Sequence, residues 1–182
     1  MPAPKPRGEG RSALVQAARK EFDSVGYDGT NTNAIARRAG YAPQTFYRHF
    51  HDKLEIFIAV YEQWTAEEIG IIGSADSPED IAAAILSQHR KSRIFRRALR
   101  DLSVRNPEMA KARASSRHRQ IEAICQRLPS YALRPRVDQV AWLLIFERLY
   151  DGVVEGDFKR LGVADDEAFR LLTDKIRSLM EA

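Results

Sequence analysis

The sequence predicts an all-α protein, with about nine helices arranged as a small N-terminal domain followed by a larger helical domain. Three observations support this fold class. Apolar residues recur at helical spacing through most of the 182 residues, and no segment shows the alternation typical of a half-buried strand. Prolines and glycines fall between these segments, where they separate one helix from the next. The hydrophobic fraction of 44% and the charged fraction of 30% are ordinary for a globular protein.

The chain is expected to begin with a flexible basic arm over residues 1–10, because prolines and glycines interrupt this segment too densely for a helix. From Arg11 to Val25 the apolar spacing predicts a helix, and Gly26 can end it in a left-handed conformation. Three possible N-caps at residues 30–32 then precede a second helix, which Gly40 ends.

A third, short helix is expected from Pro43 to Phe50. Pro43 suits the first turn of a helix, where its missing N–H costs nothing, and Phe46 and Phe50 form an apolar face. Only residues 40–42 separate this helix from the one before it. The pair therefore predicts a helix-turn-helix, in which the first helix braces the second and the second presents its N-terminal residues to DNA. We interpret residues 11–53 as a DNA-binding domain.

Residues 54–182 are expected to form the larger domain, with helices over residues 54–73, 77–89, 94–104, 108–128, 135–154 and 165–180. The helix over 135–154 is apolar nearly all round, so it must be covered on more than one side. Together with the helix over 165–180 it exceeds what one monomer is expected to bury. This predicts a homodimer in which the two helices from each chain form a four-helix interface.

Other function classes find little support in the sequence. It has no long apolar run and no secretory signal, which predicts a cytoplasmic protein without a membrane segment. Cys125 is the single cysteine, which excludes an internal disulfide. Paired carboxylates, metal-ligand spacing, a nucleophile elbow and phosphate-binding glycines are missing, so we expect no enzyme, metal or cofactor. The alternative to a DNA-binding regulator is a helical protein-binding adaptor or a ligand-binding protein without DNA activity.

Several spaced elements in residues 26–53, GYDGTNTNAIARRAGYAPQTFYRHFHDK, occur in a fixed order. They are a glycine and an aromatic residue after the first helix, a threonine-rich cap, Ile-Ala before Ala-Gly, a tyrosine, His-Phe and a lysine. Residues 11–57 thereby resemble the DNA-binding domain of TetR-family transcriptional regulators. Ala42 and Gln44 stand where that family often has serine and glycine, so an operator sequence cannot be borrowed from relatives. Residues 58–182 match the family only in their helical outline.

The DNA contacts are expected at the start of the third helix and beside it. A carboxamide such as that of Gln44 can pair bidentately with adenine, the Thr45 methyl can touch a thymine methyl, and Arg48 can reach guanine or a phosphate. The resemblance implies backbone contacts from Tyr47 and His49 and a phosphate contact from Lys53. Tyr47 as packing and His49 as a helix cap stay open, as does a minor-groove role for Lys5 and Arg7 in the arm. The complete expected set is Thr32, Asn33, Pro43, Gln44, Thr45, Tyr47, Arg48, His49 and Lys53.

The resemblance also implies a small-molecule effector that binds among the C-terminal helices and moves the helix over 54–73. In a dimer, this movement would change the spacing of two recognition helices on a palindromic operator, and release of a repressor is the expected outcome. The basic run over residues 90–119 leaves open an anionic ligand or pairing with the acidic helices. The expected pocket residues, each of which could equally be core, are Tyr61, Trp64, His89, Phe95, Trp142, Phe146 and Tyr150.

Overall fold

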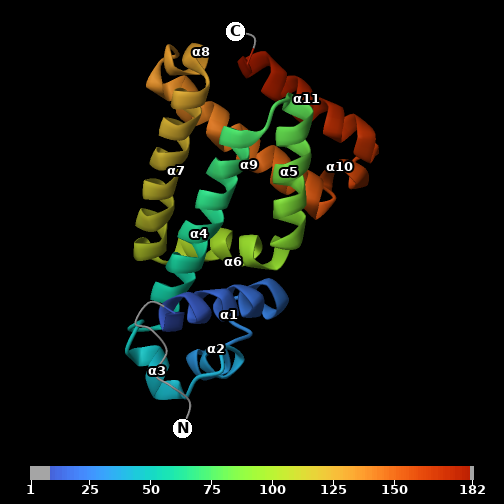
Figure 1. Cartoon of the computed structure of the whole chain (residues 1–182). Coiled ribbons are helices and arrows are strands. Elements are labelled where there is room, and N and C mark those ends of the chain that lie inside the picture. Colours follow the sequence, from blue (N-terminus) through green and yellow to red (C-terminus); the bar gives the residue numbers. More distant parts are fainter. Residues whose placement is uncertain (1–8, 181–182) are drawn as a thin grey trace. The chain divides into compact units, whose positions relative to one another are not determined.

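The computed structural model describes residues 9–180, and this part of the chain contains eleven helices and no strand (Figure 1). The all-α prediction is confirmed. Two helices more than the expected nine are present, because α8 and α10 have four residues each and are too short to show a helical period. The helices are α1 Glu9–Val25, α2 Thr32–Arg38, α3 Pro43–Tyr47, α4 Lys53–Ser74, α5 Pro78–Lys91, α6 Arg93–Arg105, α7 Pro107–Arg127, α8 Pro129–Ala132, α9 Arg136–Glu155, α10 Asp157–Arg160 and α11 Asp165–Met180.

The described chain divides into two compact units, and the first combines residues 9–64 with residues 94–112. Its core is rich in phenylalanine. Phe57 of α4 lies between Phe22 of α1, at 4.9 Å between ring centroids, and Phe95 of α6, at 4.8 Å. The expected boundary of the first domain is residue 53, whereas these contacts group part of α4 and most of α6 with the helix-turn-helix. The reason is that side chains distant in sequence share one core.

The start of α1 differs from the expected arm. Residues 1–8, with Lys5 and Arg7, lie outside the described residues, but Glu9 and Gly10 form the first turn of α1. Gly10 is buried, and a Cβ at this position would lie 2.9 Å from Nε2 of His49. Glycine is therefore suited to this position because it lets the helix approach the histidine ring closely.

The second unit combines residues 65–93 with residues 113–180. In it α5 packs against α9 and α11, and α11 also packs against α8. Leu172 and Ile176 of α11 are buried together with Ile85 of α5 and Tyr150 of α9. None of the helices in the described part of the chain is long and apolar enough to cross a membrane.

One face of α9 stays uncovered. Four large apolar side chains on it are between 38% and 71% exposed, and their spacing places them along one side of the helix. In contrast, the apolar residues of α11 are buried or half-buried within the unit. We call the exposed residues of α9 the apolar stripe; they are Val137, Val140, Leu144 and Ile145.

Candidate nucleic-acid interface and ligand pocket

The short helix α3 is anchored on one side and exposed on the other. Phe46 is fully buried, and Phe50, just after the helix, is 2% exposed. Their rings lie 5.8 Å apart, as expected for neighbours one helical turn apart. Pro43 occupies the first turn, while Ala42 at the N-cap position provides no side-chain hydrogen bond. The buried phenylalanines fix the helix, and its opposite side remains accessible.

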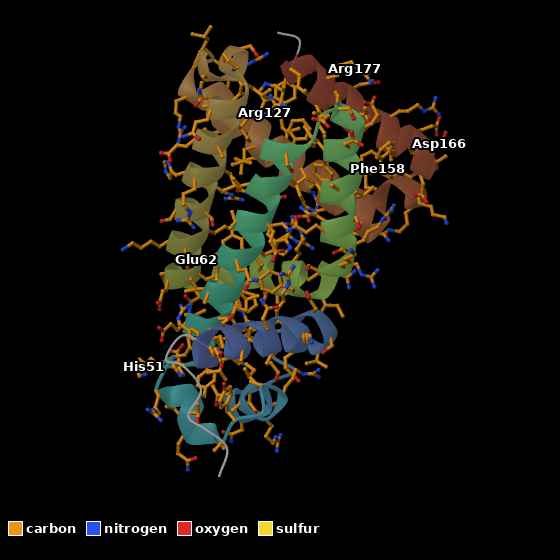
Figure 2. The ribbon with its side chains drawn as sticks, viewed as in Figure 1. His51, Glu62, Arg127, Phe158, Asp166 and Arg177 are labelled. Atoms are coloured by element: carbon orange, nitrogen blue, oxygen red, sulfur yellow. The ribbon has the colours of Figure 1, made fainter. Side chains whose placement is uncertain are left out.

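The expected DNA-contacting residues of α3 lie on this accessible side. Pro43, Gln44 and Arg48 are exposed, and Tyr47 is 58% exposed, whereas Thr45 is half-buried. Exposed carboxamide and guanidinium groups are those that read base edges in the major groove. The loop that follows α3 is marked by His51 in Figure 2.

The start of α2 lies against the end of α3. The hydroxyl oxygens of Thr32 and Tyr47 are 3.0 Å apart and share a hydrogen bond, and Asn33 beside Thr32 is exposed. Asn31 caps α2 by accepting a hydrogen bond from the Ala34 N–H at 2.9 Å. The structure thus joins residues from both helices into one polar surface. The ring of Tyr47 also packs edge-on against Phe46, so this residue combines packing with exposure.

Lys53 and His49 are half-buried, and both contact other parts of the first unit. The Lys53 ammonium donates hydrogen bonds to the backbone carbonyls of Tyr27, at 2.7 Å, and Thr30, at 3.0 Å. It also lies 4.1 Å from the centroid of the Tyr27 ring, and burial lowers the pKa of Lys53. Lys53 therefore holds the loop before α2, with one N–H left for any other partner. His49 is half-buried against Gly10.

A further polar contact that sequence analysis missed connects α1 with α2. The Glu21 carboxylate accepts hydrogen bonds from the Thr30 hydroxyl at 2.8 Å and from Arg38. The hydrogen bond from Arg38 lowers the pKa of Glu21. Nothing in the sequence alone relates a glutamate in the first helix to an arginine seventeen positions later. Thr30 lies just before α2 and Arg38 is its last residue, so the contact holds both ends of α2 against α1.

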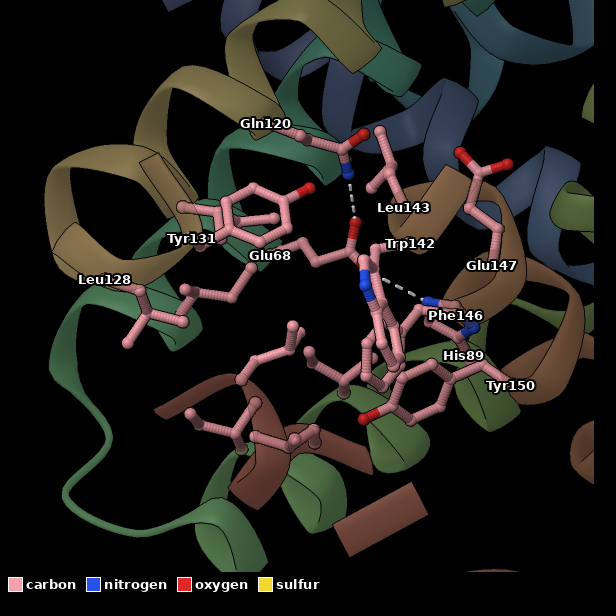
Figure 3. A pocket seen from close by; sticks show the side chains of 16 residues that line it. Glu68, His89, Gln120, Leu128, Tyr131, Trp142, Leu143, Phe146, Glu147 and Tyr150 are labelled. Atoms are coloured by element: carbon pink, nitrogen blue, oxygen red, sulfur yellow. Dashed lines mark hydrogen bonds and ion pairs between the residues drawn. The ribbon is translucent and has the colours of Figure 1, made fainter. Parts of the chain in front are cut away.

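The second unit contains a pocket with a cavity volume of about 90 Å³ (Figure 3). Eight of its sixteen lining residues are isoleucine or leucine. Four are aromatic, namely Tyr131, Trp142, Phe146 and Tyr150, and four are polar or charged, namely Glu68, His89, Gln120 and Glu147. An apolar pocket with a few convergent polar groups is the usual form of a small-molecule site.

Four of the seven expected pocket residues line this pocket: His89, Trp142, Phe146 and Tyr150. The other three, Tyr61, Trp64 and Phe95, do not line this pocket. They are at most 2% exposed and belong to the core of the first unit. Their helical spacing reflects ordinary core packing, which has the same sequence pattern as an aromatic pocket wall.

The polar groups of the pocket form a small network that sequence analysis did not find. Glu68 Oε1 lies 2.9 Å from His89 Nε2, and its Oε2 accepts a hydrogen bond from Gln120 Nε2 at 2.5 Å. All three residues are at most 8% exposed. A signal existed, because Glu68 follows Tyr61 and Trp64 at helical spacing on a buried face, where a carboxylate needs a specific partner.

The two tyrosines of the pocket differ in their hydrogen bonding. The Tyr131 hydroxyl donates to the backbone carbonyl of Gln139 at 2.6 Å, and burial raises the pKa of Tyr131 to about 12. Tyr150 is 3% exposed, and its hydroxyl has no hydrogen-bond partner in the described part of the chain. Burial, together with the nearby Glu68 charge, also raises the pKa of Tyr150. Both tyrosines are therefore neutral at physiological pH.

Comparison with known proteins identifies the N-terminal segment. A family model described as "Bacterial regulatory proteins, tetR family" matches residues 14–60. The HTH-type transcriptional activator FasR of Mycolicibacterium smegmatis is 40% identical over 58 residues, which are 32% of this chain and 26% of that protein. The matched segment spans about a quarter of the length of this curated relative.

Solved structures share the fold over nearly the whole chain. A putative TetR-family transcriptional regulator from Rhodococcus sp. has a TM-score of 0.72 at 18% identity, covering 95% of this chain and 99% of that one. A putative transcriptional regulator from Saccharomonospora viridis, in complex with choline, has a TM-score of 0.67 at 16% identity, covering 94% and 97%.

The helical fold and the exposed face of α3 define a helix-turn-helix protein. The match over residues 14–60 includes α2, α3 and most of α1, which are the elements that build this face. Residues 14–60 of the chain therefore match the tetR family of bacterial regulatory proteins.

Proposed function

We propose that the protein is a dimeric transcriptional regulator that binds a palindromic DNA site through α3. The observation that carries this proposal is the asymmetry of α3, in which Phe46 is buried whereas Gln44 and Tyr47 are exposed, as is Arg48 directly after the helix. A short helix fixed by its apolar side can present the other side to a major groove without reorganising. Thr32 and Asn33 extend the same surface toward the phosphates.

The apolar stripe of α9 supports the proposal that the protein is a dimer. Monomeric proteins seldom expose several large aliphatic side chains along one helix, and burying them between two copies removes them from water. We propose a symmetric interface centred on α9, with the neighbouring α11 at its side. Two copies of α3 about 34–36 Å apart would then meet successive major grooves, so each half of the operator is read by one protomer.

The pocket of the second unit provides a place for a small-molecule effector. Residues of α4 fall in both units, and Glu68 and Ile72 of this helix line the pocket. A ligand that binds better to one position of α4 would shift the population toward it and alter the spacing of the two α3 helices. The choline complex of the S. viridis protein supports the view that this fold can hold a small organic molecule.

The sign of regulation is proposed to be repression. A dimer that occupies a promoter blocks polymerase without any further contact, whereas activation requires an additional surface. The FasR relative is named an activator, so a promoter–reporter measurement with and without the protein decides the matter. Lower reporter output with the protein supports repression, and higher output contradicts it.

The DNA assignment is tested by selecting binding sequences from a random duplex library with the full-length chain. We expect palindromic or nearly palindromic sequences, and an affinity that falls steeply as salt rises, because phosphate contacts release counterions. If no sequence is enriched, or if affinity does not depend on salt, the DNA-binding proposal fails and a protein-binding adaptor becomes the better reading.

The dimer is tested by sedimentation of a variant with a charge in the apolar stripe. We expect the wild type to sediment as a dimer and Leu144→Asp as a monomer, because an unpaired carboxylate is costly in an apolar interface. Leu161→Asp is the matched control, since Leu161 is 83% exposed and lies outside the stripe. A monomeric wild type, or equal sedimentation of both variants, would remove α9 from the interface.

A further inference from the structure

We propose that the pocket of the second unit takes a small organic cation, with an ammonium group at its polar end and an apolar body. This inference rests on the proposed function in one respect, namely that the pocket is the effector site. Three features of the lining favour such a cation: a buried carboxylate, two buried polar atoms without hydrogen-bond partners among the described residues, and aromatic walls.

The buried carboxylate sets the sign of the charge that the pocket favours. Glu68 is 8% exposed, and Figure 3 shows it between His89 and Gln120, with which it interacts. Glu147 also lines the pocket, but its carboxylate accepts hydrogen bonds from Arg113 and Arg117, so the preference for a cation depends on Glu68. Among the described residues, no lysine or arginine lines the pocket. A ligand carboxylate or phosphate would therefore meet like charge without a charged partner, which costs binding energy in a buried site.

Two buried atoms indicate where a ligand would form hydrogen bonds. The Gln120 amide uses its nitrogen to donate to Glu68, which leaves its carbonyl oxygen as an acceptor. This oxygen and the Tyr150 hydroxyl are buried, and neither has a hydrogen-bond partner in the described part of the chain. Gln120 is 5% exposed and Tyr150 is 3% exposed. Since unpaired buried polar atoms are costly, a ligand that supplies N–H donors would satisfy them.

The walls suit the body of such a ligand. Trp142, Phe146 and Tyr150 follow one another along α9, with ring centroids 5.8 Å and 6.4 Å apart. Aromatic faces attract an ammonium group through their quadrupoles, and the eight aliphatic side chains suit an alkyl or aryl body. A neutral alcohol could satisfy Gln120 and Tyr150, but only a cation would also gain from Glu68. Tighter binding of a cation than of a neutral alcohol of the same shape therefore distinguishes these two ligand classes.

The test compares three ligands of the same shape that differ in charge. Benzylamine is a cation at neutral pH, benzyl alcohol is neutral and benzoate is an anion. Their binding to the full-length protein without DNA is measured by isothermal titration calorimetry. We expect benzylamine to bind at least about tenfold more tightly than benzyl alcohol, because a hydrogen bond to a charged group exceeds a neutral one. We expect benzoate to bind more weakly than both.

Glu68→Gln tests whether this carboxylate causes the preference. The variant keeps the size of the side chain and a hydrogen-bonding carbonyl, and we expect it to reduce the preference for benzylamine over benzyl alcohol to less than about threefold. Glu67→Gln is the matched control, because it makes the same charge change one position earlier on α4 and does not line the pocket. A thermal melt of each variant confirms that it is folded before titration.

The proposal is overturned if benzoate binds most tightly, if none of the three binds, or if Glu68→Gln keeps the full preference while folded. If Glu68→Gln does not fold, Tyr150→Phe replaces it and should weaken benzylamine binding severalfold; unchanged binding overturns the proposal. DNA binding is measured separately by gel shift. Cation binding with no effect on DNA binding would contradict the regulatory proposal alone, whereas DNA binding without cation preference would contradict only this inference.

Discussion

The exposed face of α3 and the pocket of the second unit use similar side chains in opposite environments. Gln44 on α3 and Arg48 just after it are exposed and Tyr47 is 58% exposed, whereas Gln120 in the pocket is 5% exposed and His89 is 1% exposed. Exposed polar groups are solvated by water until a partner replaces it. Buried ones must pair with each other, as Glu68 does with His89 and Gln120. A substitution in the first region should therefore affect binding alone, and one in the second should also affect folding.

The largest effect is expected where α3 meets its own core. Phe46→Ala removes a fully buried ring and should lower the free energy of unfolding by about 3–5 kcal/mol. Denaturant unfolding of the full-length protein measures this loss. Tyr47→Ala is the matched control next to it, and because Tyr47 is exposed its effect should stay within about 1 kcal/mol. Equal losses for both variants would show that α3 is not anchored by its buried side.

The next effect concerns binding by the exposed face. Gln44→Ala should weaken binding to the selected DNA by about 1–3 kcal/mol, the cost of one lost bidentate base contact. Its free energy of unfolding should stay within about 0.5 kcal/mol of the wild type, because the side chain is exposed. Fluorescence anisotropy and denaturant unfolding provide the two values. Gln126→Ala, which changes an exposed glutamine on α7, is the control and should alter neither DNA affinity nor the free energy of unfolding. If Gln44→Ala lost stability but kept its DNA affinity, the exposed face of α3 would not be a binding surface.

In the pocket, a change of similar size is expected, but in the free energy of unfolding. Glu68→Ala removes the acceptor of the Gln120 amide and should lower the free energy of unfolding by about 1–3 kcal/mol. Glu67→Ala on the same helix serves as the control and should cost less. Buried charges also carry a desolvation penalty, so a variant as stable as the wild type would show that the network contributes nothing net to folding.

The smallest effect is expected at Glu21, whose pKa is lowered by hydrogen bonds from Arg38 and Thr30. Because the pKa in the folded state lies below the ordinary value of 4.5, the contribution to stability is complete above that pH and is lost as pH falls through the folded-state pKa. Arg38 is 46% exposed, so screening by water keeps the effect below about 1 kcal/mol. Glu21→Gln should reduce the free energy of unfolding at neutral pH and abolish this part of its acid dependence. An unchanged acid dependence would contradict the assignment.

The two regions also differ in how far the sequence reveals them. Thr32 to Lys53 is one continuous segment, so its caps, turn and buried phenylalanines could be read in order. The pocket draws its lining from six helices, α4, α5, α7, α8, α9 and α11, so no short motif describes it. Aromatic periodicity found His89, Trp142, Phe146 and Tyr150 but could not separate them from the core residues Tyr61, Trp64 and Phe95.

The role of Lys53 shows a second limit of sequence reading. The resemblance implied a phosphate contact, and in the structure its ammonium holds the carbonyls of Tyr27 and Thr30. A sequence pattern gives the position of a charged residue, but not which backbone carbonyls the folded chain brings close to it. Similarly, the sequence places Gly10 in a flexible arm, whereas the structure places it in the first turn of α1. Its close approach to His49 depends on tertiary contacts, which a local sequence pattern does not reveal.

The central claim, that the exposed face of α3 reads DNA, is tested most directly by repeating the library selection with Gln44→Ala and comparing the enriched sequences with those of the wild type. We expect palindromic sequences for both proteins, with the base preference lost at one symmetric pair of positions in the variant and kept elsewhere. Identical base preferences for the two proteins, or no enriched sequence for the wild type, would contradict this claim.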